Sequence, residues 1–422
     1  MASAFTLYAA TAVFLVTYVL VSLRTIRRFS IERPAVALLG GALMLVFGVL
    51  SPADAIASIN LDVLLLLIGM MILVSDLEAC GFFDVISSRI ALRAKTQVSF
   101  LVWLMLATAA LSALVLNDTI ALLVTPVVVR SAKALRINPV PYLVAVAVAA
   151  NVGSVATEVG NPQNAFIAIR SGIPFLTFTA SLLPVTAVCL AVATAFIWLA
   201  FRKDLSLPLM KESSLPAVPL QRRGLFVTLG ITVAVAIAFF VSPTPEWLPL
   251  IAMVGGSFVL FTLPFVSSAT PRTLIAKVDW SIVLFFIGLF VVLGGVRASG
   301  LSGAIQTGFS AVFGGRTGGV AWLTGLTALL SNLISNVPAV LLLAEVVQGA
   351  GGSQQLWLTL AASSTLAGNA TILGAACNVI VVQVASRDGV EVSMKQFMKA
   401  GLPITAVTLV LAALLITVLV PP

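Results

Sequence analysis

The stretch EVGNPQNAF, residues 158–166, lies in the middle of a long apolar run of the sequence. It brings a glutamate, two asparagines, a glutamine, a glycine and a proline to the depth where a membrane-spanning helix is normally most apolar. Irregular backbone at that depth leaves N–H and C=O groups without partners unless the segment is buried in protein or lines a wet cavity. The stretch therefore predicts an interrupted helix whose unwound backbone and polar side chains form a binding site.

The composition around this stretch is typical of a helical membrane protein. Of the 422 residues, 60% are hydrophobic and 9% are charged, and apolar runs of roughly 15–25 residues recur along the whole chain. Barrel strands would instead alternate in polarity over about 10 residues. We therefore expect an all-α polytopic membrane protein.

The residue types also limit the chemistry. Cys80, Cys189 and Cys377 are scattered without CxxC spacing, which argues against a disulfide framework and a thiolate metal site. The chain has no histidine, so a proton handled inside the membrane must ride mainly on Asp or Glu. We expect no metal and no cofactor other than a proton gradient, with sodium as an alternative coupling ion.

The net charge of +8 comes from Lys and Arg residues in short clusters between apolar runs. This is the positive-inside pattern of membrane proteins, and it is favoured over nucleic-acid binding. All but three basic residues (Arg170, Arg297 and Arg316) fall in six segments that we predict to be cytoplasmic: 24–33, 89–95, 130–136, 202–223, 272–277 and 387–399.

With this assignment, residues 96–130 must begin and end on the cytoplasmic side. We interpret them as a re-entrant hairpin with its tip at LNDT (116–119), and residues 318–347 as a second hairpin with its tip at ISNVP (334–338). Two thin spans in place of each hairpin remain an alternative. We therefore expect the protein in the cell inner (plasma) membrane, with both termini on the outer side. The ten predicted crossings are 4–22, 34–52, 60–76, 139–169, 174–200, 224–242, 247–267, 279–295, 354–385 and 400–420.

The two halves of the chain resemble each other. A shift of 219 residues aligns LPVTAV (183–188) with LPITAV (402–407), and a small gap aligns TEVGNPQN (157–164) with TILGAACN (371–378). The same shift pairs Gly69 with Gly288, Gly81 with Gly300, Asn117 with Asn336, and Pro184 with Pro403.

Five crossings per half make the two copies oppositely oriented, which predicts two inverted repeats, each with one re-entrant hairpin and one broken helix. The N-terminal membrane repeat is 1–201, the cytoplasmic linker 202–223 and the C-terminal inverted repeat 224–422. Inverted repeats are the usual architecture of secondary transporters, whose site forms at the midplane where interrupted helices meet. Here the interruptions are the tips at Asn117 and Asn336 and the breaks at 153–164 and 368–378.

Asp118 and Glu158 are the candidates for proton or cation coupling. An unpaired carboxylate at the membrane midplane costs about 2.5–3.5 kcal/mol, so it needs a function or a partner. Asp118 can instead cap the next helix, and Glu158 can be a neutral hydrogen-bonded acid. Their counterparts in the second half, Val337 and Ile372, are apolar, so the repeated scaffold is shared while the ionisable groups are not.

The hydrogen-bonding wall of the predicted site consists of Asn, Thr and Ser residues at the tips and breaks. Each of them could satisfy backbone groups rather than contact solute. Cys377 could bind a thiophilic solute or simply pack. Arg170 is expected to extend to the outer surface, with pairing to an acid in the cavity as the alternative. No other Lys or Arg is expected in the cavity. The predicted substrate-binding residues are Asn117, Thr119, Thr157, Asn161, Asn164, Ser335, Asn336, Asn369, Thr371, Cys377 and Asn378.

Over essentially its whole length the chain resembles the ion transporter superfamily. GFFD (81–84), NDTIALLVTPVVV (117–129) and SNVPAVLL (335–342) are most similar to the branch of arsenite efflux carriers (ArsB) and NhaD-type antiporters. GNPQN (160–164) and GNATILGAACN (368–378) are more similar to the anion-transporter branches. The resemblance implies a secondary active transporter, for which a soluble ATPase partner is compatible but not required.

We expect export of arsenite or antimonite in exchange for protons. Arsenous acid is neutral and needs only hydrogen bonds, whereas a multivalent anion would need positive charge in the cavity. The alternatives are a sodium-coupled dicarboxylate or sulfate-type anion symporter, a sodium/proton antiporter, and a channel. An enzyme has little support, because the sequence has no Ser–His or HExxH constellation and no paired aspartate motif.

Overall fold

The computed structural model describes residues 4–22, 25–26, 29–30, 32–206, 220–267, 269–304, 306–307 and 319–421. Within these ranges every regular element is helical except a short antiparallel ladder of β1 (Thr25–Ile26) and β2 (Phe29–Ser30). Most of the predicted linker, as well as Arg316, lies outside the described residues.

The helices of the first half follow the predicted segments closely. They are α1 (Ala4–Ser22), α2 (Arg33–Val46), α3 (Pro52–Ser58), α4 (Leu61–Ala79), α5 (Phe82–Arg93), α6 (Gln97–Leu114), α7 (Asn117–Ala134), α8 (Val140–Ser154), α9 (Pro162–Ser171) and α10 (Phe175–Ala200).

A short helix, α11 (Arg202–Leu205), lies at the start of the predicted linker, and the second half follows the linker. Its helices are α12 (Arg222–Val241), α13 (Trp247–Val266), α14 (Pro271–Ala276), α15 (Trp280–Ala298), α17 (Gly319–Ile334), α18 (Asn336–Gly349), α19 (Gln354–Ala367), the 3-10 turns η1 (Gly368–Ala370) and η2 (Ile372–Gly374), α20 (Ala376–Arg387) and α21 (Met394–Leu419).

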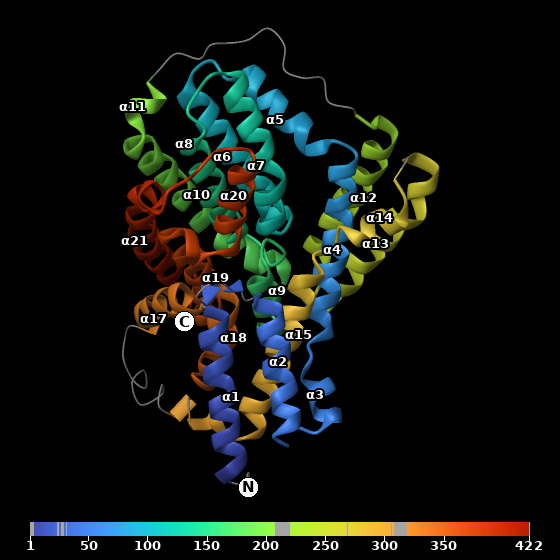
Figure 1. The fold of residues 1–422 in the computed structure, drawn as a ribbon, viewed down its shortest axis with the longest axis vertical. Coiled ribbons are helices and arrows are strands. Elements are labelled where there is room, and N and C mark those ends of the chain that lie inside the picture. The colour runs from blue at the N-terminus through green and yellow to red at the C-terminus, as the bar shows by residue number, and fades with distance from the viewer. Residues whose placement is uncertain are drawn as a thin grey trace.

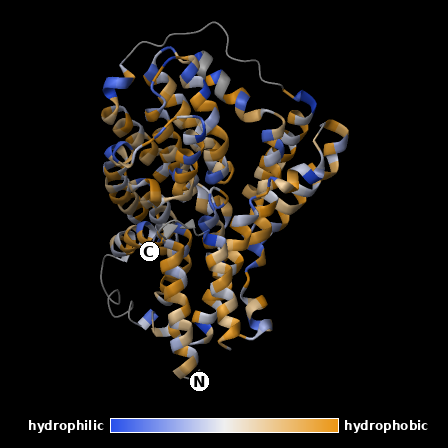
Figure 2. Ribbon diagram, in the orientation of Figure 1, coloured by the Kyte–Doolittle hydropathy of each residue, from blue (hydrophilic) through white to orange (hydrophobic). Residues whose placement is uncertain are grey.

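Seven of the described helices are long and apolar enough to cross a membrane: α1, α6, α10, α12, α13, α15 and α21. An eighth span results if α3 and α4, which meet at 52°, are counted as one. Large apolar side chains such as Phe226 and Phe265 are exposed on these helices, as expected where lipid is the solvent. Hydrophobic residues dominate the helical ribbons in Figure 2. The chain is therefore a polytopic helical integral membrane protein, as predicted.

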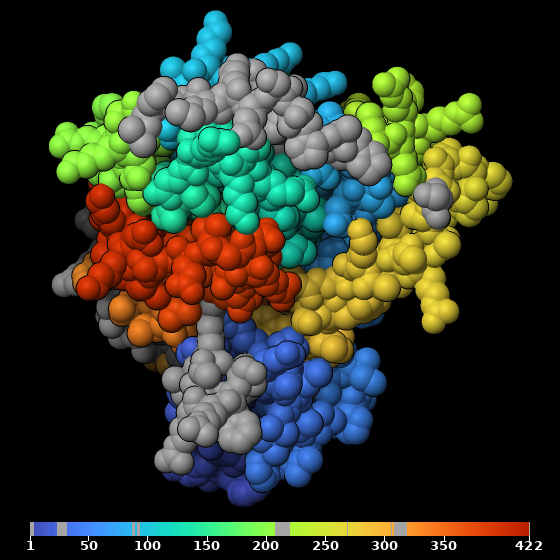
Figure 3. Space-filling model, turned by 45° about the horizontal axis from the view of Figure 1, so that its top comes forward, coloured from blue at the N-terminus to red at the C-terminus, as the bar shows by residue number. Residues whose placement is uncertain are grey.

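The helices form distinct groups in space (Figure 1). Helices α5 to α8 lie together at the top left, α1 to α3 extend to the lower end, and α4 runs with α12, α13 and α14 in an arm on the right. The space-filling view shows the first three helices as a lobe at one end (Figure 3). Helices α9, α15, α18 and α20 lie between these groups, near the middle of the molecule.

Two helix crossings depend on glycines that the repeat had paired. At Gly69 of α4 a Cβ atom would lie 2.5 Å from the backbone of Ala252 in α13. At Gly288 of α15 it would overlap the backbone of Ala37 in α2. Both helix pairs therefore pack with their backbones in close approach, as small residues permit in membrane proteins.

Both predicted helix breaks are present. Helix α8 ends at Ser154 and α9 begins only at Pro162, whereas α19 ends at Ala367 and α20 begins at Ala376. Helices α6 and α7 are parted at 115–116, and α17 and α18 are parted at Ser335, whose φ of 75° is rare for a residue with a side chain. The re-entrant path and the inverted orientation remain predictions.

We predict that Gly69→Leu lowers the stability of the folded protein by about 1–3 kcal/mol or more, because the new side chain must force two backbones apart. Gly230→Leu on α12 is the control, since a Cβ there meets nothing within 4 Å. The measurement is the midpoint of thermal aggregation in detergent, followed by size-exclusion chromatography. Equal midpoints for the two variants would contradict the close crossing.

Candidate solute-binding cavity

Each interhelical tip is hydrogen-bonded to a helix break. The backbone N–H of Asn117, the first residue of α7, donates to the carbonyl of Gly160 at 2.9 Å. The Asn336 amide at the start of α18, oriented with its nitrogen toward acceptors, donates to the carbonyls of Gly374 at 3.2 Å and Ser364 at 3.1 Å. The two tips and the two breaks thus form one connected structure.

The two helix breaks are also held by equivalent hydrogen bonds. The Asn164 side chain donates to the carbonyls of Ser154 and Thr157, both at 3.0 Å. The Asn378 side chain donates to the carbonyls of Gly368 at 2.8 Å and Thr371 at 2.9 Å. Each amide therefore bonds to carbonyls ten and seven residues earlier in the chain. Both asparagines replace backbone partners that the interrupted helices lack.

Asn151 of α8 joins the two halves of the chain, and sequence reasoning missed it. Its side-chain oxygen accepts from the Asn117 amide at 3.2 Å. Its nitrogen donates to the side-chain oxygens of Asn369 at 2.9 Å and Asn378 at 3.1 Å, and the Cys377 sulfur lies 3.0 Å from its oxygen. A signal was present, because Asn151 is the one amide residue within the apolar helix α8.

We predict that Asn151→Leu, a change of similar size, destabilises the protein by about 1–3 kcal/mol for each buried polar group that loses its partner. The free energy of unfolding is measured by denaturant titration in mixed micelles. If Asn151→Leu is as stable as the unmodified protein, the network is not what holds the tips and breaks together.

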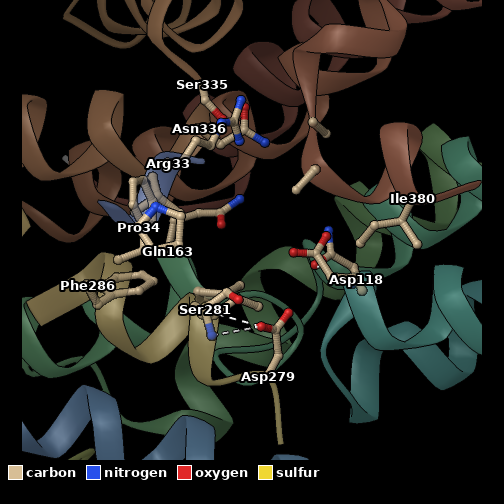
Figure 4. Close-up of a pocket in the computed structure, with 17 residues that line it drawn as sticks. Arg33, Pro34, Asp118, Gln163, Asp279, Ser281, Phe286, Ser335, Asn336 and Ile380 are labelled. Carbon is tan, nitrogen blue, oxygen red and sulfur yellow. Dashed lines mark hydrogen bonds between the residues drawn. The ribbon is translucent and has the colours of Figure 1, made fainter. Parts of the chain in front are cut away.

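A cavity of about 190 Å³ lies beside this network. Of the described helices, six begin at its wall: α2, α7, α9, α15, α18 and α20. In Figure 4, Asp118 and Ile380 lie on one side, Arg33, Pro34 and Gln163 on the other, and Ser335 and Asn336 at the top. The remaining lining residues are Asn117, Pro162, Asp279, Ser281, Ile282, Phe285, Phe286, Val337, Ala375 and Ala376.

Four of the predicted site residues line this cavity: Asn117, Asp118, Ser335 and Asn336. Gln163 is a further lining residue, which was not among the predicted site residues although it lies within the stretch 158–166. The other predicted substrate-binding residues are not part of the wall; they are Thr119, Thr157, Asn161, Asn164, Asn369, Thr371, Cys377 and Asn378.

Some residues behind the wall fix its position. The Asn161 side chain accepts from the N–H of Asn164 at 2.8 Å, which caps α9. It also donates to the Thr365 hydroxyl at 3.2 Å, and the Gln163 amide donates to the same hydroxyl at 3.3 Å. The first break is therefore tied directly to α19 of the second half.

Glu158 lies in the first break and is separated from the cavity. Its side chain is fully buried, and neither carboxylate oxygen has a hydrogen-bond partner among the described residues. A buried unpaired carboxylate is costly, so Glu158 is stable in this conformation only as a neutral acid. It can gain or lose a proton only when water reaches it.

The expectation that the cavity has no basic residue is wrong. Arg33, the first residue of α2, was placed in a cytoplasmic segment, but it lines the cavity opposite Asp118 (Figure 4). The reason is tertiary, because the start of α2 packs beside the start of α15 and the tip of α18. Asp279 also lines the cavity and caps α15 by accepting from the N–H of Ser281 at 3.0 Å.

Arg170 reaches the surface, as expected, and it also pairs with a buried acid. Its guanidinium lies 3.7 Å from the Glu345 carboxylate, which pairs at 2.7 Å with Arg297. The Glu345 side chain is buried. The cluster ties the end of α9 to α15 and α18.

We predict that Glu345→Gln destabilises the protein by about 1–2 kcal/mol, because it leaves two arginines facing each other without a counter-charge. The effect stays below that of a fully buried pair, since the arginine side chains are 33% and 38% exposed. Asp84→Asn, which breaks the exposed pair with Arg130, is the control and should cost less than about 1 kcal/mol. Thermal midpoints in detergent compare the two, and a larger loss for Asp84→Asn would contradict the assignment.

Asp76 of α4 is a further buried acid, and it was not among the residues selected from the sequence. It is 2% exposed, and it accepts a hydrogen bond from the Thr228 hydroxyl of α12. This contact lies away from the cavity wall and connects two helices of the arm. Within the described ranges, no cluster of three or more acidic or cysteine side chains suits a metal ion.

The family model for the CitMHS citrate transporters matches residues 18–362. The chain belongs to this family. Among its relatives, "Uncharacterized transporter Rv2684" of Mycobacterium tuberculosis is 32% identical over 425 residues, which is 96% of each chain. "Silicon efflux transporter LSI3" of Oryza sativa is 29% identical over 448 residues and covers 89% of this chain and 90% of its own.

The fold is similar to that of a solved transporter, YdaH of Alcanivorax borkumensis. The TM-score is 0.62 over 98% of both chains, at 15% sequence identity. The family and these relatives are transporters, not enzymes. The chain is thus a secondary transporter of the citrate transporter family, within the ion transporter superfamily.

Proposed function

We propose that this transporter exports arsenite or antimonite, as the neutral oxyacid, in exchange for protons. The observation that carries the proposal is the wall of the cavity, where Asn117, Gln163 and Asn336 offer amides beside the ionisable Asp118. A small hydroxyl-bearing solute needs such donors and acceptors and no net charge. The efflux named for the rice relative supports the outward direction.

Asp118 provides the coupling in this proposal. As a carboxylate it accepts a hydrogen bond from a hydroxyl of the oxyacid, and such charge-assisted bonds are strong. Once protonated, Asp118 loses its charge and can accept only a weaker, neutral hydrogen bond. Proton and solute therefore compete for one side chain, which is the condition for exchange in opposite directions.

Glu158 takes a second role in the same cycle. Because it is sealed and unpartnered in this conformation, it holds its proton here and releases it in a state where the break opens to water. Asp118 then responds to solute, whereas Glu158 responds to the conformation. This division explains why the two acids lie in different environments.

The proposed architecture is the inverted repeat with both termini outside the plasma membrane. Cys189 of α10 and Thr408 of α21 support it, because these residues are 219 positions apart and lie in contact, with the sulfur 3.7 Å from the carbonyl. The repeat makes them equivalent positions, so α10 and α21 would meet at the axis relating the halves. A soluble ATPase partner is not required by this scheme.

A second candidate function is symport of a dicarboxylate or similar anion, driven by sodium or protons. Arg33 and the six helix starts at the cavity favour it, since helix N-termini carry partial positive charge. The description of the family as citrate transporters points the same way.

Flux through the purified protein in lipid vesicles tests both functions. With an imposed proton gradient and no sodium, we expect arsenite to accumulate at the expense of the gradient. Asp118→Asn and Glu158→Gln should abolish coupled accumulation while the folded protein is retained, because both substitutions remove a titratable proton and little volume. Asp84→Asn, far from the cavity, should transport normally.

Strict sodium dependence together with competition by citrate would establish the second function instead. Unchanged accumulation in both Asp118→Asn and Glu158→Gln would exclude these acids as the coupling groups.

A further inference from the structure

We propose that the Asp118 carboxylate is the internal anion of the cavity and that its charge, opposite Arg33, selects the class of solute. With Asp118 ionised, the cavity takes a neutral hydroxyl-bearing solute; with Asp118 neutral, it takes a doubly charged oxyanion. The inference rests on the proposed function only in taking this cavity as the solute site.

The fixed part of the cavity is electropositive. Helices α2, α7, α9, α15, α18 and α20 all begin at its wall, and each helix start is equivalent to roughly half a positive charge. Asn117, Ser335 and Asn336 add no formal charge. Such a convergence of helix starts favours a negative group within the cavity.

Three side chains of the described wall carry formal charge: Arg33 from α2, Asp118 from α7 and Asp279 from α15. Asp279 is engaged with the start of its own helix, where it accepts from the N–H groups of Ser281 at 3.0 Å and Ile282 at 3.4 Å. Asp118 faces Arg33 across the open space (Figure 4), and the two charges interact. The lining residues of α9, α18 and α20 are uncharged.

Asp118 therefore supplies a negative group that the electropositive cavity favours. A dianion entering beside it would meet both the attraction of Arg33 and the repulsion of Asp118 at short range, where charges inside protein are weakly screened. Neutralising Asp118 removes this repulsion and leaves the positive charge of Arg33 and of the helix starts without an internal counter-charge. The selectivity of the cavity thus depends on whether the Asp118 side chain is charged.

Sulfate is the probe, because it stays doubly charged at neutral and mildly acidic pH. Its binding is measured by titration calorimetry on the full chain in detergent, at constant ionic strength near neutral pH. We expect Asp118→Asn to bind sulfate at least about tenfold more tightly than the unmodified protein, which corresponds to about 1.4 kcal/mol. The double variant Arg33→Gln/Asp118→Asn should lose this gain.

A further control, besides the double variant, tests whether the effect arises in the cavity. Asp84→Asn makes the same chemical change outside the cavity and should leave sulfate affinity unchanged. A gain that persists in Arg33→Gln/Asp118→Asn, a gain in Asp84→Asn, or no gain in Asp118→Asn would each overturn the proposal.

A second substitution covers the case in which Asp118→Asn folds poorly. Asp118→Ser also removes the carboxylate and should bind sulfate at least about tenfold more tightly than the unmodified protein. Asp279 also lines the cavity, but Asp279→Asn should gain less than Asp118→Asn, because the Asp279 carboxylate is engaged with the start of α15. No gain in Asp118→Ser, or an equal gain in Asp279→Asn, would contradict the role of Asp118.

These results are independent of the vesicle experiment. Failure of arsenite transport with a gain of sulfate binding in Asp118→Asn would refute the proposed function and keep the charge selector. Arsenite transport without a gain of sulfate binding in Asp118→Asn would keep the proposed function and refute the charge selector.

Discussion

Backbone hydrogen bonding at interrupted helices is the constraint on which the rest of this structure depends. Inside an apolar protein, each helix end leaves N–H or C=O groups that water cannot reach. Here four interruptions meet, and they are satisfied by one another: tip against break through Asn117 and Gly160, and break against its own flank through Asn164 and Asn378. Asn151 then links the two halves through its amide contacts with Asn369 and Asn378, while it also holds Asn117 of its own half.

The cavity follows from this solution. Carbonyl ends are occupied by asparagine amides, whereas several helix starts are left facing a common space. These helix starts favour a negative group in the space, whose wall also holds Arg33 and two aspartates. The position of the cavity and the charges around it are therefore consequences of how the broken helices are closed. The close crossings at Gly69 and Gly288 let the arm and the lower helices pack near this centre.

Acidic side chains have distinct surroundings in the same fold. Asp118 is in the wall, Glu158 is sealed without a hydrogen-bond partner among the described residues, Asp76 is hydrogen-bonded to Thr228, and Glu345 is paired with two arginines. The partners of Asp76 and Glu345 explain how these two acids can be buried. Asp118 and Glu158 are the two acids to which the proposed function assigns the coupling.

The sequence by itself determined the helical segments, their breaks and the polar tips, because hydrophobic runs, glycines and prolines act locally. It also selected Asn117, Asp118, Ser335 and Asn336, since polar residues at membrane depth require a reason. Only the tertiary structure decided which polar residues face the cavity and which bond to backbone, as for Asn164 and Asn378. It also brought Arg33 from a basic cluster into the wall and Arg170 to Glu345, because long-range packing, rather than local pattern, sets which charges meet.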